Sequence, residues 1–185
     1  MDLFVDACRR QYRNSFAMAR QAVELCPDGV WTMREEREPP FWQQMFHALQ
    51  ITEGSAGEGF SDWRTDLAER VLQPRAPSQG EPPFGPLVEA VRNLMDPSYE
   101  PPEVVTRQEM LRLVDETESC CFRALERDAG RPADAAEANP FPWTGTTSYD
   151  KHIYNLRHLH HHLGRINGLL RRLADIGNPW VMEST

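Results

Sequence analysis

The stretch 157-RHLHHHLGRINGLLRR-172 decides the fold, because apolar side chains recur in it at the spacing of one helix face. At about 100° per residue, one arc of the helical wheel collects Leu159, Ile166, Leu169, Leu170 and Leu173. The pattern predicts an amphipathic helix from about residue 149 to about residue 176. Thr147 or Ser148 is its expected cap, and Gly177 with Pro179 is expected to end it.

Two of the four histidines in this stretch share the apolar arc. On the wheel, His162 lies inside the arc and His158 at its edge, whereas His160 falls on the solvent side and His161 flanks the core. His158 and His162 are one turn apart on one face, the spacing by which two imidazoles can reach a single metal ion. The residues alone leave open that both are hydrogen-bonded core histidines, or part of a solvated face.

Three more helices are predicted from the same periodicity. Residues 2–25 form the first, which ends at "CPDG", and residues 41–54 form the second, which begins after two prolines and is apolar on most of its circumference. The third, residues 106–127, opens with the capping-box pair Thr106 and Glu109. The expected fold is therefore all-α, a four-helix bundle with at least one long crossover connection.

The connection between the second and third helices is the irregular part of the chain. Residues 54–105 are rich in proline and glycine, with short helices expected within 61–73 and 83–95. Its aromatic residues suggest that it packs in part: Phe60, Trp63, Phe84 and Tyr99. A length of 185 residues predicts a single domain, 1–185.

Composition excludes several classes of function. The net charge of −8 argues against nucleic-acid binding, which needs clustered Lys and Arg. No apolar run reaches the length of a membrane span, and the first residues lack a secretory-signal pattern, so a cytoplasmic protein is expected. The cysteines show no C-x-x-C spacing and are interpreted as small free thiols: Cys8, Cys26, Cys120 and Cys121.

A third histidine completes a possible metal site. His47 lies in "FWQQMFHALQ" on the second helix, and helix bundles build metal sites from facing helices. Alone it is more simply a core histidine. With His158 and His162 it forms a His₃ set that leaves positions open for water or substrate, as in catalytic zinc sites. Nickel, iron and manganese are alternatives.

The chain resembles the DinB-like family, four-helix-bundle metalloproteins related to bacterial damage-inducible proteins and thiol-dependent S-transferases. The resemblance rests on three segments: "MFHALQ" (45–50), "TRQEM" (106–110) and "NLRHLHHHLGRINGLLRR" (155–172). It implies that His47, His158 and His162 bind a divalent metal ion. After Gly164 the family usually has Gln, and this chain has Arg165, which could bind an anionic substrate group or be a salt-bridged surface residue.

The resemblance implies a metalloenzyme, either a thiol-dependent S-transferase or a hydrolase. Its partner would be a small-molecule substrate, such as a low-molecular-weight thiol. The sequence leaves open whether the chain also forms a homodimer. No general base is evident, although Asp150 and Glu53 lie near helix ends. Two alternatives stay open: a non-catalytic metal- or small-molecule-binding stress-response protein, and a structural helical dimer.

Overall fold

The computed structural model describes residues 2–57, 66–72, 85–132 and 144–181, and every regular element within them is a helix. None of these helices is both long enough and apolar enough to cross a membrane. Their bounds are α1 Leu3–Leu25, α2 Asp28–Trp31, α3 Phe41–Ala56, α4 Asp66–Val71, α5 Gly85–Asn93, α6 Arg107–Asp128 and α7 Ser148–Ala174.

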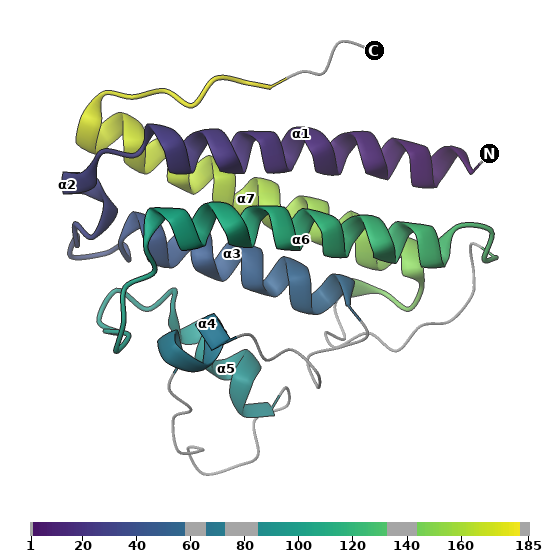
Figure 1. Cartoon of the computed structure of the whole chain (residues 1–185), viewed down its shortest axis with the longest axis horizontal. Helices are drawn as coiled ribbons and strands as arrows, with labels where there is room; N and C mark the ends of the chain where they lie inside the picture. Colours follow the sequence, from purple (N-terminus) through teal and green to yellow (C-terminus); the bar gives the residue numbers. More distant parts are fainter. Residues whose placement is uncertain (1, 58–65, 73–84, 133–143, 182–185) are drawn as a thin grey trace.

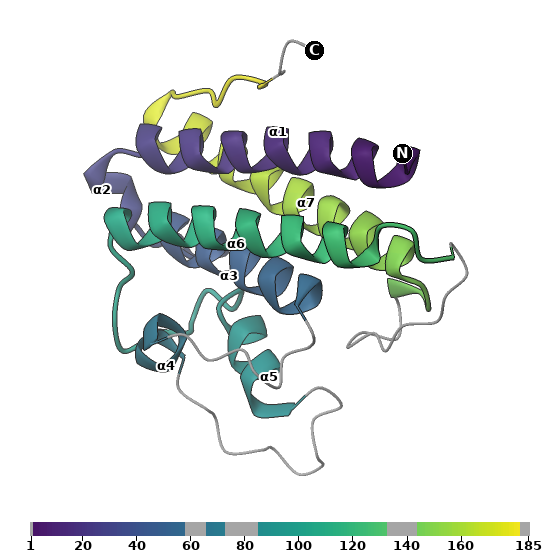
Figure 2. The same ribbon diagram turned by 45° about the vertical axis from the view of Figure 1, so that its right-hand side comes forward.

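The four long helices lie side by side, and each packs against two of the others (Figures 1 and 2). α1 contacts α6 and α7, and α3 contacts the same two helices. α1 and α7 run in one direction, and α3 and α6 run in the other (Figure 1). Because α3 and α6 are parallel neighbours, the chain between them crosses back along the molecule, as the sequence predicts.

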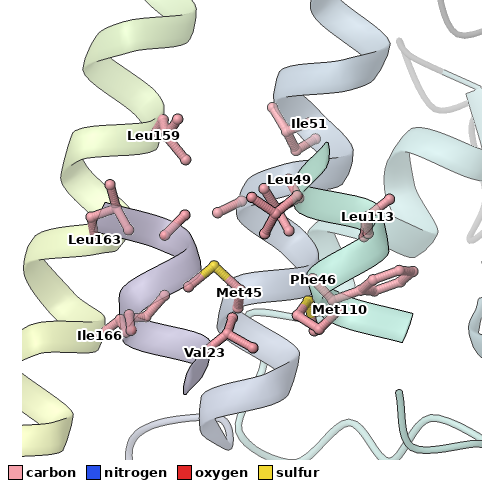
Figure 3. Packing of buried hydrophobic residues seen from close by; sticks show 14 of the residues in the cluster. Val23, Met45, Phe46, Leu49, Ile51, Met110, Leu113, Leu159, Leu163 and Ile166 are labelled. Atoms are coloured by element: carbon pink, nitrogen blue, oxygen red, sulfur yellow. The ribbon is translucent and has the colours of Figure 1, made fainter. Parts of the chain in front are cut away.

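The core fills the space between these helices. Figure 3 shows buried apolar side chains from all four long helices, among them Val23 of α1, Met45 of α3, Met110 of α6 and Ile166 of α7. Their recurrence on one face of each helix is the pattern that predicts the fold. As the sequence predicts, α3 is buried on several sides, and Glu53 is the one residue of α3 that is not fully buried.

α4 and α5 confirm the two short helices expected between α3 and α6, and they lie outside the four long helices (Figure 2). α5 packs on α3. The Gln43 side-chain amide helps to hold the following segment on α3, because its Nε2 atom donates to the carbonyl oxygens of Leu94 (2.8 Å) and Tyr99 (3.3 Å). Tyr99 is buried, whereas Phe60, Trp63 and Phe84 lie outside the described residues.

The helix ends match the predicted caps in two places and differ from the prediction in two. Capping boxes formed by Thr106 with Glu109 and by Thr147 with Asp150 open α6 and α7. α3 continues past Gly54 to Ala56, because the packing of α3 against α6 and α7 outweighs the low helix propensity of one glycine. α7 ends at Ala174, two residues before the predicted end, and its cap is Asp175, with a left-handed φ of 55°, rather than the expected Gly177. The short helix α2 was not predicted. The four cysteines are free thiols, as expected.

Candidate metal centre

Three histidines from two neighbouring helices meet in the structure. One nitrogen from each of His47, His158 and His162 lies within 4.8 Å of the other two, and no other such group of metal-binding side chains occurs in the described ranges. The ring centroid of His47 is 5.5 Å from that of His158 and 4.7 Å from that of His162. α7 supplies two of the rings because residues four apart share one helix face, and that face packs on α3.

The tautomer of His47 follows from its contact with α5. Its Nδ1 atom lies 2.8 Å from the carbonyl oxygen of Val91. A carbonyl only accepts hydrogen bonds, so Nδ1 carries the proton and donates it, and Nε2 keeps its lone pair. Metal-binding histidines are commonly oriented by such a bond from the second ring nitrogen.

The other two rings each have one nitrogen atom without a hydrogen bond to the described residues. The Nδ1 atoms of His158 and His162 are buried and have no hydrogen-bond partner in the described part of the chain. A buried polar atom without a partner costs about 1–3 kcal/mol. Three imidazoles gathered around one point, with nitrogens left unsatisfied, fit a bound metal ion better than they fit an apolar core.

The three imidazoles are neutral near pH 7. Burial lowers the pKa of His47 to about 4 and that of His158 to about 3. Burial also lowers the pKa of His162, and the proximity of His47 and His158 lowers it further. A neutral imidazole is the form that binds a metal ion, so the site does not need to lose protons before loading.

Aromatic and cationic groups surround the triad. The ring of Tyr154 stacks on that of His158 with centroids 5.9 Å apart, and the exposed His161 meets His162 edge-on at 5.1 Å. Arg165 is half-buried beside the triad, and its positive charge lowers the pKa of both His47 and His162. It makes no hydrogen bond or ion pair with the described residues, so it differs from a salt-bridged surface arginine.

The two acidic residues considered as general bases have other roles or positions. The Asp150 carboxylate accepts from the backbone and hydroxyl of Thr147 in the capping box of α7. Glu53 lines a surface hollow of about 410 Å³ with residues of α6. Asn155 bonds the carbonyl of Thr52, and Asn167 accepts from the backbone of Asn178, so both amides act as structural groups.

His160 is placed differently from its prediction. The wheel puts it on the solvent side, but it is half-buried, and its Nε2 lies 2.7 Å from the hydroxyl of Ser15 on α1. α7 packs on α1 as well as on α3, so its buried arc is wider than its apolar arc. His160 therefore belongs to the helix interface and lies off the metal-facing side.

A second polar cluster was not predicted. The carboxylate of Asp128, at the end of α6, lies 3.1 Å from His152 Nε2 and 3.3 Å from Lys151 Nζ. The hydroxyl of Tyr12 lies 3.2 Å from the other ring nitrogen of His152. All four side chains are at least 98 % buried. The wheel could have found His152, since six residues before His158 is about 120° round, level with Leu170.

Comparison of the chain with family models, with curated proteins and with solved structures found no match, so its function is argued from this site.

Proposed function

We propose that this protein is a metal-dependent enzyme of the DinB-like type, a four-helix bundle with a His₃ site for one divalent ion. The observation that carries the proposal is the convergence of His47, His158 and His162, with ligand nitrogens within 4.8 Å of one another. Burial and neutrality of the three rings support it, because both favour metal binding over protonation.

The donor set narrows the choice of metal. Three imidazoles without a carboxylate suit zinc, nickel or iron, and manganese is less favoured because it prefers oxygen ligands. Three protein ligands leave at least one position for an exogenous molecule, which is typical of catalytic rather than structural sites. When bound, such an ion supplies Lewis-acid chemistry that lowers the pKa of a coordinated water or thiol.

Neighbouring residues orient the proposed ligands. The Val91 carbonyl holds the ring of His47 in one tautomer, and Tyr154 covers one face of His158. Asp150 is committed to the helix cap, and the largest charge effects on the pKa of the three rings come from neighbouring histidines and arginines. A thiol needs less help than water to lose its proton, so a thiol-dependent S-transferase is favoured over a hydrolase.

The same lack of an acid–base group favours a second candidate. A protein that binds a metal and a small molecule without turnover needs the three ligands and nothing more. The two candidates share the metal site and differ in whether a bound thiol reacts with an electrophile.

The first experiment is elemental analysis of untagged protein purified without chelator. We expect about one divalent ion per chain, and loss of most of it in His158→Ala and His162→Ala. His160→Ala is the matched control, because His160 lies between them in sequence but bonds Ser15 on another helix. A wild-type protein that binds no zinc, nickel or iron overturns the proposal.

The second experiment separates the candidates. The loaded protein is mixed with a low-molecular-weight thiol and a panel of electrophiles, and thiol consumption is followed. Consumption that depends on His158 supports the transferase. Thiol binding with no consumption across the panel supports the binding protein.

A further inference from the structure

The proposed site would carry a net positive charge when it holds a divalent ion. Its three ligands are neutral, so a divalent ion would bring two positive charges that no ligand neutralises. The arginines with the largest effects on the pKa of two of the ligands add further positive charge: Arg165 acts on both His47 and His162, and Arg92 acts on His47. A molecule that enters such a site is favoured if it is negative.

The two arginines differ in their partners. Arg92 of α5 pairs with Glu89 at 3.0 Å, so a carboxylate already offsets its charge. Arg165 has no such partner among the described residues. Between Asp150 and Asp175 the sequence of α7 contains no Asp or Glu, so its own helix offers Arg165 no acid beyond the first turn.

Three other basic residues of α7 contact an acidic or aromatic side chain. Lys151 pairs with Asp128, Arg172 pairs with Glu35, and Arg157 lies over the ring of Tyr154. Arg165 and Arg171 are the two basic residues of α7 without a hydrogen bond, ion pair or ring contact to the described residues, and of these two only Arg165 is half-buried. The protein nevertheless has a net charge of −8. A half-buried arginine without a partner gives up part of its hydration, and an anionic ligand would restore the lost interactions.

Helix geometry places Arg165 at the metal centre. It follows His162 by three residues, and residues at this spacing are neighbours on the helix surface. Long helical side chains lean toward the N-terminus, which directs the guanidinium back over the turn that carries His162. A guanidinium also matches a carboxylate with two parallel hydrogen bonds, which glutamine at the same position cannot do.

We infer that Arg165 selects a small organic carboxylate, which binds its guanidinium while another atom of the same molecule takes the open position on the metal. This inference rests on the proposed metal site and deepens it by assigning a class of ligand. Arg165 acts as a specificity residue in this role.

The test uses the protein loaded with Co²⁺, whose visible absorption reports thiolate binding. Two thiols of equal length are titrated: 3-mercaptopropionate, which carries a carboxylate, and 3-mercaptopropan-1-ol, which does not. We expect the wild type to bind the carboxylate about tenfold more tightly, the effect of one charge-assisted bidentate contact. Arg165→Gln is expected to abolish this preference and to leave the affinity for the alcohol unchanged, and Arg165→Lys to keep part of it.

Arg171→Gln is the control, since it removes the same charge from the same helix at an exposed position six residues away. The inference is overturned if Arg165→Gln keeps the preference, if Arg171→Gln loses it equally, or if Arg165→Gln no longer holds Co²⁺. Failure of the wild type to bind Co²⁺ instead contradicts the proposed metal site, and the inference falls with it. If the wild type binds Co²⁺ but neither thiol changes its spectrum, the metal site stands and the inference is overturned.

Discussion

The Nδ1 atom of His47 on α3 lies 2.8 Å from the carbonyl oxygen of Val91 on α5. A helix outside the four long ones therefore sets the proton position of a proposed metal ligand. The two functions of His47 use different nitrogens of its ring: Nδ1 makes the structural hydrogen bond, and Nε2 is free to bind the metal. The two functions can be separated by substitution.

His47→Asn is expected to keep the bond and lose the metal. Its amide nitrogen can donate to Val91 from the position that Nδ1 occupies, but it offers no atom in place of Nε2. His47→Leu loses both, and the unpaired carbonyl of Val91 lowers the free energy of unfolding by a further ~1–3 kcal/mol. Metal analysis and urea unfolding of the two metal-free variants check this. Equal stabilities would show that the bond to Val91 contributes nothing.

The metal-free protein is expected to lose stability on acidification. The folded state holds the pKa of His47 at about 4 and that of His158 at about 3, against 6.5 for an ordinary histidine. Below pH 6.5 these histidines become protonated in the unfolded chain but stay neutral in the folded chain. The free energy of unfolding therefore falls as the pH falls toward 4. Each group contributes at most about 1.4 kcal/mol per pH unit.

Urea unfolding of the metal-free protein at several values between pH 7 and pH 4 measures this slope. His158→Leu removes one titrating group and is expected to flatten the slope. A midpoint that stays constant over this range would contradict the depressed pKa values.

The histidine triad could be predicted because two of its members depend on local periodicity. Two of them share a helix face by their spacing alone, and His47 is the natural third because helices in a bundle face one another. The structure brings His47, His158 and His162 together as that reasoning expects. A metal ion and a substrate are not part of the chain, so the periodicity of the sequence identifies neither the metal nor the reaction.

The position of His160 and the cluster around Asp128 could not be read from periodicity in the same way. Ser15 is 145 residues from His160, and Tyr12 is 140 residues from His152. A helical wheel ranks positions by their distance from the apolar arc, but it does not know which polar groups the neighbouring helices will present. Buried polar clusters are decided by such long-range pairs.

Gly145→Ala is expected to destabilise the start of α7. Gly145 has a φ of 99°, and an added Cβ would lie 2.4 Å from the Cγ atom of Asp150. The substitution strains the backbone and displaces the carboxylate that caps the helix, a loss of about 1–3 kcal/mol. Thermal unfolding measures it, with Gly168→Ala as the counterpart. An added Cβ at Gly168 meets nothing within 4 Å, so this helical position is expected to gain about 0.5–1 kcal/mol. A neutral Gly145→Ala would show that the cap tolerates rearrangement.

Asp128→Asn is expected to be the most destabilising single change outside the hydrophobic core. It leaves Lys151, whose side chain is 2 % exposed, as a buried cation without its carboxylate 3.3 Å away. Breaking one partner of a buried ion pair costs about 3–5 kcal/mol, whereas replacing both partners by neutral groups costs far less. The double variant Asp128→Asn with Lys151→Met should therefore recover most of the loss in urea unfolding.

The exposed pair of Arg20 and Asp115 is the control, and Asp115→Asn should cost less than about 1 kcal/mol. Metal content should be unchanged in all three, because the cluster shares no ligand with the histidine triad. A double variant as unstable as Asp128→Asn would show that the carboxylate acts through its other partners, His152, Arg127 and Arg131, rather than through Lys151.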